Sequence, residues 1–81
     1  MQVTVFFHSY FKELAGCARA SEDLPAGSTL GDLYEKLILR FPKLKAMQKS
    51  TLMAVGLDYQ RQSHVLKEAD EVSLFPPVQG G

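Results

Sequence analysis

The sequence has 81 residues, 46% of them hydrophobic, and nine basic side chains balance nine acidic ones to a formal net charge of zero. A chain of this length forms one domain that buries about 60–65% of its unfolded surface, which leaves little room for a concave catalytic pocket. The absence of net charge removes any general electrostatic reason to expect nucleic acid or an anionic membrane as a partner.

The residue content also bears on location and on metal binding. The single cysteine, Cys17, excludes an intramolecular disulfide and so a disulfide-rich secreted scaffold. The N-terminus lacks the features of a signal peptide, and no stretch approaches the roughly 18 apolar residues of a membrane span, so we expect a cytoplasmic protein. His8 and His64 have no partners at ligand spacing, so we expect no metal site, and we interpret Cys17 as a small hydrophobic residue.

The first strand is predicted over residues 2–8. Val3, Val5 and Phe7 alternate with other residues in a run rich in β-branched and aromatic types. Apolar residues stand on both faces of this run, which favours a central strand over an edge strand.

A short helix and a weaker strand are predicted next. Residues 9–16 are typical of a helical turn with Ser9 as N-cap, Leu14 facing inward and Gly16 near its end. Residues 18–24 predict a strand, since a Pro-Ala-Gly turn signal follows them.

The main helix is the clearest element of the sequence. Ser28 or Thr29 can cap its N-terminus, Asp32 lies in the favourable first turn, and Pro42 must end it because its ring cannot continue the hydrogen-bond ladder. Apolar residues recur at the three-four spacing of one helical face: Leu30, Leu33, Tyr34, Leu37, Ile38 and Phe41.

The remaining segments complete the predicted sheet. Residues 42–49 form a basic loop or a second short helix, residues 52–55 a short buried strand with a turn after it, and residues 71–75 the last strand. The order strand, strand, helix, strands predicts an α+β protein with the β-grasp fold of ubiquitin-like proteins. Its mixed sheet would carry the main helix on one face. We divide the chain into a β-grasp domain, residues 1–75, and an extended tail, residues 76–81.

The tail has the composition of a reactive group on a stiff stalk. Pro76 and Pro77 stop the strand and favour an extended, semi-rigid exit from the sheet. Gly80 and Gly81 lack Cβ atoms, so their backbone can enter a channel too narrow for larger residues. A Gly-Gly pair alone is equally typical of a frayed terminus.

The ending from Phe75 to Gly81 resembles the molybdopterin synthase small subunit family, whose C-terminus typically reads Phe-Pro-Pro-Val-X-Gly-Gly. One departure is Gly56, where members of that family often carry Asn. Weaker matches follow in order along the chain, at Val3 to Phe7, Glu13 to Gly16, Ser28 to Leu30, Ala54-Val55 and Asp70 to Val72.

The resemblance implies a ubiquitin-like sulfur carrier with no active site and no bound cofactor of its own. An adenylating, activating enzyme would use ATP on the Gly81 carboxylate, and sulfur transfer would leave a thiocarboxylate. Two small and two large subunits would form a heterotetramer, in which the sulfur passes to cyclic pyranopterin monophosphate to build the dithiolene of the molybdenum cofactor. The segment that would insert into the large catalytic subunit is Pro76, Pro77, Val78, Gln79 and Gly80.

The resemblance also implies a partner interface at Phe7, Tyr59 and Phe75, because exposed aromatic residues beside an extended tail mark an interaction surface. Phe7 and Phe75 are equally compatible with core positions on their strands, whereas Tyr59, in a turn, is expected to be exposed. A basic patch is expected to be a solvated surface or a contact for an acidic partner; its members are Arg40, Lys43, Lys45 and Lys49.

Three other functions remain open. The chain could carry sulfur for thiazole or another product, although its length and the Pro-Pro-Val ending argue against this. It could be a protein modifier that joins lysine side chains through Gly81. It could also be a β-grasp interaction module with an inert tail.

Overall fold

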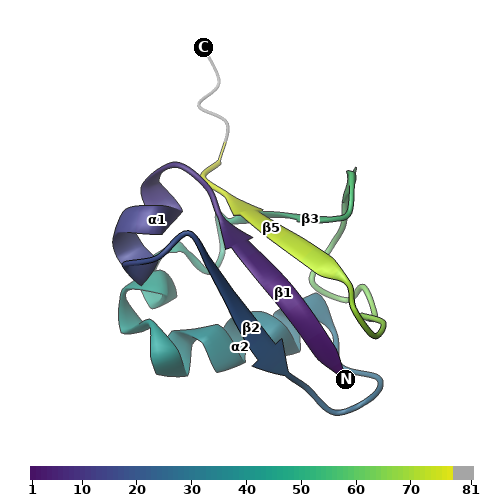
Figure 1. The fold of residues 1–81 in the computed structure, drawn as a ribbon. Coiled ribbons are helices and arrows are strands. Elements are labelled where there is room, and N and C mark those ends of the chain that lie inside the picture. Colours follow the sequence, from purple (N-terminus) through teal and green to yellow (C-terminus); the bar gives the residue numbers. More distant parts are fainter. Residues whose placement is uncertain (78–81) are drawn as a thin grey trace.

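The computed structural model describes residues 1–77, which form a five-stranded mixed sheet with one long helix packed across one face (Figure 1). The order of the strands across the sheet is β2-β1-β5-β3-β4. Their bounds are Gln2–Phe7 for β1, Arg19–Asp23 for β2, Leu52–Val55 for β3, Asp58–Tyr59 for β4 and Glu71–Phe75 for β5.

The first and last of these strands, β1 and β5, lie parallel in the middle of the sheet. Val5 stands opposite Val72, and Phe7 stands opposite Leu74. Each of the two strands has an antiparallel neighbour on its other side. Parallel strands need a long crossover, and the main helix lies within it. The α+β, β-grasp prediction and the central position of the first strand are both confirmed.

The main helix, α2 (Leu30–Arg40), begins with a capping box. The hydroxyl oxygen of Thr29 accepts a hydrogen bond from the Asp32 N–H at 3.2 Å, and the Asp32 carboxylate accepts one from the Thr29 N–H at 2.9 Å. Of the two predicted caps, Thr29 is therefore the one used. Ser28 instead donates its hydroxyl proton to the Pro25 carbonyl oxygen.

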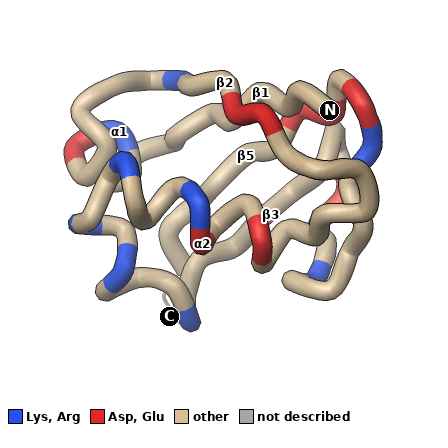
Figure 2. Tube along the Cα trace, turned by 90° about the horizontal axis from the view of Figure 1, so that it is seen from below, with Lys and Arg blue, Asp and Glu red and all other residues tan. Residues whose placement is uncertain are grey.

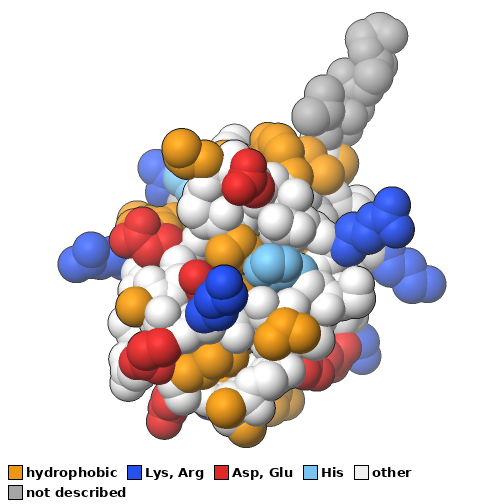
Figure 3. All heavy atoms as spheres, turned by 90° about the vertical axis from the view of Figure 1, so that its right-hand side faces the viewer, with side chains coloured by type: hydrophobic (Ala, Val, Ile, Leu, Met, Phe, Trp, Pro, Cys, Tyr) orange, Lys and Arg blue, Asp and Glu red, His pale blue; other side chains and the backbone are white. Residues whose placement is uncertain are grey.

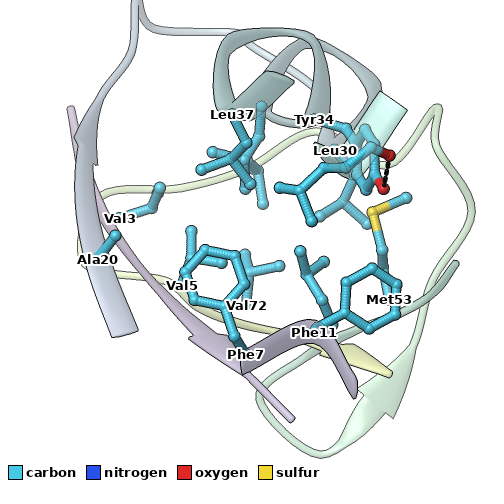
Figure 4. Packing of buried hydrophobic residues seen from close by; sticks show 14 of the residues in the cluster. Val3, Val5, Phe7, Phe11, Ala20, Leu30, Tyr34, Leu37, Met53 and Val72 are labelled. Carbon is cyan, nitrogen blue, oxygen red and sulfur yellow. Dashed lines mark hydrogen bonds between the residues drawn. The ribbon is translucent and has the colours of Figure 1, made fainter. Parts of the chain in front are cut away.

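The core lies between α2 and the sheet face turned toward it (Figure 4). Tyr34 carries a hydroxyl group into this core, 2.7 Å from the Leu44 carbonyl oxygen and 3.1 Å from the hydroxyl oxygen of Thr51. Burial raises the pKa of Tyr34 above its usual value of 10.0, and the hydrogen bond with Thr51 opposes part of that shift. The fully buried side chains include Val3, Val5, Phe7, Phe11, Leu30, Leu33, Leu37, Leu44, Val72 and Leu74.

The short helix α1 (Tyr10–Ala15) differs from the sequence prediction on its inward side. Phe11 is fully buried, whereas Leu14 is half-buried. A phenyl ring removes more apolar surface from water than a leucine side chain, so the helix turns Phe11 inward. Ser9 precedes the helix with φ of 54° but makes no capping hydrogen bond with its side chain. Gly16 ends the helix in the left-handed conformation, as predicted.

The structure defines two further segments more closely than the sequence does. The stretch after α2 is a short 3-10 helix, η1 (Pro42–Met47), which packs against α1 and α2. The turn predicted at residues 56–58 is only partly a turn, since Asp58 and Tyr59 form β4, the edge strand beside β3. Gly56 closes this hairpin with φ of 60°, a conformation that glycine and asparagine both adopt readily.

Within residues 1–77, no helix has the length and apolar character needed to cross a membrane.

Candidate functional site

The tail leaves the sheet from one of its central strands. β5 ends at Phe75, and Pro76 and Pro77 follow it as half-buried residues outside any strand. Figure 1 shows the chain leaving the sheet at the end where β1 runs into α1. The remaining predicted tail residues lie outside the described part of the chain: Val78, Gln79, Gly80 and Gly81.

Strand alternation decides which aromatic residues can reach a partner. Phe7 is only 2% exposed and meets the Phe41 ring edge-on, with 5.4 Å between ring centroids. The sequence left Phe7 open between surface and core, and the structure places it in the core, so its ring is not available to a partner. Side chains alternate between the two faces of a strand, so the neighbouring half-buried Phe6 points to the face that α2 does not cover. We call this the open face.

Three aromatic side chains lie together on the open face at the exit of the tail. The His8 ring stacks on Phe75, with 4.4 Å between centroids and 9° between planes. Tyr59 meets Phe75 edge-on at 6.1 Å and 66°, which is a favourable arrangement for two aromatic rings. We call His8, Tyr59 and Phe75 the aromatic cluster.

The backbone register explains how this cluster forms. Phe7 is paired with Leu74, so the next residue on each strand, His8 and Phe75, falls side by side. The His8 N–H also donates to the Leu74 carbonyl oxygen at 3.1 Å, which fixes its position. Tyr59 reaches the same face because β4 pairs it with Ala54.

The aromatic cluster belongs to a wider apolar surface. Phe6 and Leu52 are half-buried at neighbouring positions of the open face, and Tyr59 is 66% exposed. Figure 3 shows apolar side chains gathered where the grey residues begin. Exposed aromatic rings at such a place are typical of a protein interface. Phe6, His8 and Leu52 are not among the predicted interface residues, although the alternation that places Val3 and Val5 on one face indicates Phe6 and His8 for the other.

The basic patch is smaller than predicted. Lys43, Lys45 and Lys49 are exposed on and just after η1. Arg40 does not join them, because its guanidinium pairs with the buried carboxylate of Glu22. Figure 2 shows basic residues on the α1 side of the molecule and acidic residues near the N-terminus.

The other polar candidates are dispersed over the molecule. Cys17 is half-buried and packs against the core. His8 is part of the aromatic cluster, whereas His64 lies in the loop after β4. In the described part of the chain, no three His, Cys, Asp or Glu side chains are grouped as ligands of one metal ion.

The sequence profile of the ThiS family matches residues 5–81, which is nearly the whole chain. The chain belongs to the ThiS family. A relative in this family, the molybdopterin synthase sulfur carrier subunit of Chlamydomonas reinhardtii, is 31% identical over 83 aligned residues, and the alignment covers all of both chains. This relative confirms the resemblance to molybdopterin synthase small subunits that the tail and the weaker matches indicated.

Solved structures agree with the β-grasp fold of this ThiS family chain. The crystal structure of SAMP1 from Haloferax volcanii superposes with a TM-score of 0.89 at 21% identity, over the full length of both chains. A chain in the complex of subunits 1 and 2 of the molybdopterin-converting factor from Helicobacter pylori superposes with a TM-score of 0.69 at 23% identity, also over both full lengths.

Proposed function

We propose that this chain is the sulfur carrier subunit of a molybdopterin synthase and that the Gly81 carboxylate is its reactive group. The observation that carries the proposal is the end-to-end match to the sulfur carrier subunit of Chlamydomonas reinhardtii. The geometry of the described residues fits it, because Pro76 and Pro77 follow a central strand beside the aromatic cluster, of which Tyr59 is exposed.

The chemistry needs the tail and two partner proteins. A carboxylate is a poor electrophile until one of its oxygen atoms becomes part of a leaving group. The activating enzyme would join the Gly81 carboxylate to AMP, with release of pyrophosphate from ATP. A sulfur nucleophile would then displace AMP and leave a thiocarboxylate. None of these steps requires a side chain or a bound cofactor of this chain, so the carrier has no active site of its own.

The loaded tail would deliver its sulfur in the active site of the large subunit. The acceptor would be cyclic pyranopterin monophosphate, and the product would be a dithiolene. Because a dithiolene holds two sulfur atoms, each product consumes two loaded tails, which fits the heterotetramer with two carriers. We expect this work to take place in the cytoplasm, where the thiocarboxylate and the thiol of Cys17 would stay reduced.

The length of the tail would limit how far the active site of the large subunit can lie from the aromatic cluster. Six residues, 76–81, can span at most about 20 Å when fully extended. The large subunit must therefore bind the open face with its active site within that reach of Phe75. In the Helicobacter pylori structure, a chain of the same fold forms a complex with the second subunit of the converting factor, which supports a partner of this kind.

Deletion of Gly81 tests the proposal. When the wild-type carrier is incubated with an activating enzyme, ATP and a sulfur donor, its intact mass should rise by the difference between one sulfur and one oxygen atom. The shortened carrier should show no such increase, and it should keep the same circular dichroism spectrum, because the last strand of the sheet ends at Phe75.

Two outcomes would contradict this function. Normal cofactor synthesis by the shortened carrier would show that Gly81 is not the reactive residue. Conjugate bands on a denaturing gel that depend on Gly81, without any thiocarboxylate-dependent cofactor synthesis, would favour a protein modifier instead.

A further inference from the structure

A hollow lies at the β4 edge of the sheet, next to the aromatic cluster. Its volume is about 440 Å³, and it opens to solvent. Tyr59 contributes to both features, since its ring meets Phe75 and the residue is part of the lining of the hollow. The residues that line it are Tyr59, Gln60, Arg61, Ser63 and His64.

The walls of the hollow are held in place by backbone hydrogen bonds. The loop begins where the Gln60 N–H donates to the Met53 carbonyl oxygen at 3.0 Å, which ties it to β3. Its far side accepts two hydrogen bonds from the first turn of α2, one from the Leu30 N–H to the His64 carbonyl oxygen at 3.0 Å and one from the Gly31 N–H at 2.9 Å. A loop bonded at both ends loses little conformational freedom when it binds a partner.

Glycine at position 31 lets the loop approach α2 closely. A Cβ atom there would lie 3.4 Å from the Gln62 carbonyl oxygen, the acceptor of the Gly31 N–H. The N–H groups of the first turn of α2 are therefore occupied by the loop and by the capping box. The Gln62 side chain donates to the Gln48 carbonyl oxygen at 3.4 Å, and the residues that line the hollow are exposed or half-buried.

The polar groups of this hollow suit an anion. The Arg61 guanidinium is always charged, and no carboxylate side chain lies among the lining residues. Within residues 1–77, no Asp or Glu side chain forms an ion pair with Arg61. Asp58 is next to Tyr59 in the sequence, but it occupies the alternate strand position opposite Val55 and so points to the other face of the sheet. The amide of Gln60 and the hydroxyl of Ser63 add neutral hydrogen-bond donors.

We propose that this hollow receives a carboxylate side chain of the large subunit, which forms an ion pair with Arg61 beside the aromatic cluster. The inference rests on the proposed function, because it takes the large subunit as the protein that covers the open face. Tyr59 belongs both to the aromatic cluster and to the lining of the hollow, so a partner that covers Tyr59 comes next to Arg61. The guanidinium plane can bind a carboxylate through two parallel N–H bonds, which fixes the orientation of the partner as well as adding affinity.

The open shape of the hollow also bears on the ligand. A small molecule bound alone is usually enclosed on most of its surface, and this hollow is not closed on its outer side. A side chain that projects from a docked protein is shielded from solvent by that protein. The carboxylate is therefore assigned to a residue of the partner rather than to a free metabolite.

Measurement of carrier binding to its large subunit tests the inference. Wild-type carrier, Arg61→Gln and Arg61→Glu would be titrated into the large subunit from the same organism at low and at physiological salt. We expect Arg61→Gln to weaken binding about tenfold and Arg61→Glu to weaken it further. The difference should shrink as the salt concentration rises.

Lys67→Glu is the matched control, because Lys67 is another exposed cation of the β4–β5 connection that does not line the hollow. It should change the affinity much less than Arg61→Glu. Reversal of each acidic residue on the large subunit in turn should identify one that restores binding to Arg61→Glu.

The outcomes separate this inference from the proposed function. If the wild-type carrier fails to bind the large subunit at all, the proposed function is wrong and the inference falls with it. If Arg61→Glu binds as tightly as the wild type, the inference alone is wrong. A site for free anions would be shown if inorganic phosphate shifted the amide resonances of residues 60–64 while Arg61→Glu left subunit binding unchanged, and this too would overturn the inference.

Discussion

The hydroxyl group of Tyr34 links three segments of the core. It lies within hydrogen-bond distance of the Leu44 carbonyl oxygen in η1 and of the Thr51 hydroxyl just before β3. The ring itself is 1% exposed and packs among the apolar residues of α2 and the sheet. A single side chain thus fixes η1 against the main helix.

Tyr34→Phe should lower the free energy of unfolding by about 1 kcal/mol, because the Leu44 carbonyl oxygen loses its hydrogen-bond donor while the ring is kept. Urea unfolding at neutral pH measures the change. Tyr10→Phe is the control, since Tyr10 is 48% exposed and its hydroxyl makes no hydrogen bond to the described residues. An unchanged stability for Tyr34→Phe would show that these two hydrogen bonds add nothing net.

The same residue predicts a pH dependence. Burial raises the pKa of Tyr34 above 10.0, so the folded protein disfavours the phenolate more than the unfolded chain does. The contribution of Tyr34 to stability is therefore complete below pH 10 and is lost as the pH rises through the raised pKa. The stability advantage of the wild type over Tyr34→Phe should shrink above pH 10. An advantage that stays constant to pH 11 would contradict this assignment.

Strand β2 is an edge strand, and α2 covers part of its free edge with two cations one helical turn apart. Arg40 donates to the Ser21 carbonyl oxygen at 3.0 Å and pairs with the Glu22 carboxylate. Lys36 donates to the Asp23 carbonyl oxygen and lies 3.9 Å from the same carboxylate. Ser21 and Asp23 hold the strand positions whose carbonyl groups face away from β1. Covered carbonyl groups cannot pair with another strand.

The double variant Lys36→Met with Arg40→Met should both destabilise the protein and promote self-association. Glu22 is 4% exposed and would lose its partners, at a cost of about 1–3 kcal/mol. The uncovered edge should produce dimers that light scattering detects at high protein concentration. Addition of Glu22→Gln should restore part of the stability and leave the dimers, which separates the two effects. Exposed lysines of η1, changed as Lys43→Met with Lys45→Met, serve as the control, and equal association by both double variants would refute the role of the edge.

Helices and strands with a regular hydrophobic period could be predicted from the sequence. Elements that depend on a contact with a distant segment of the chain could not. The apolar positions of α2 and the alternation of β1 are local patterns, so the sequence predicts both elements within one or two residues. β4 has two residues, which is too short for any period, and it exists because β3 offers it an edge. Phe11 rather than Leu14 is the buried residue of α1, and this too depends on distant elements, because α1 packs against η1 and the sheet.

In the candidate site, too, local features could be predicted from the sequence and contacts between distant segments could not. The residue types of the tail are visible in the sequence, and so is the aromatic character of Tyr59 and Phe75. The neighbourhood of His8 and Phe75 depends on the parallel register of the first and last strands, which no local pattern contains. For Phe6 and Phe7 a local pattern is enough, because the alternation with Val3 and Val5 buries Phe7 and leaves Phe6 on the open face.

For the molecule as a whole, the open face is expected to provide most of the binding energy for the large subunit. Tyr59→Ala should leave the fold intact, because the side chain is 66% exposed, and should weaken subunit binding about 30-fold or more, as loss of a central aromatic residue of an interface does. Isothermal titration calorimetry with the large subunit gives the affinity.

Leu39→Ala is the control for this experiment, since Leu39 is 82% exposed on α2, away from the open face. It should bind as the wild type does. Equal affinities for Tyr59→Ala and the wild type would place the interface elsewhere on the molecule.

The position of β5 between two other strands also has a mechanical consequence. When the last residues of a carrier are bound inside another protein, separation of the two proteins pulls the carrier along the axis of its final strand. β5 is bonded to β1 on one side and to β3 on the other, so such a pull loads two hydrogen-bond ladders in shear, all bonds at once. A tail attached to β4 would load a two-residue edge strand, whose bonds could open one after another. We therefore expect the protein to release its tail from a partner by sliding it out whole, with the fold acting as a rigid anchor against the applied force.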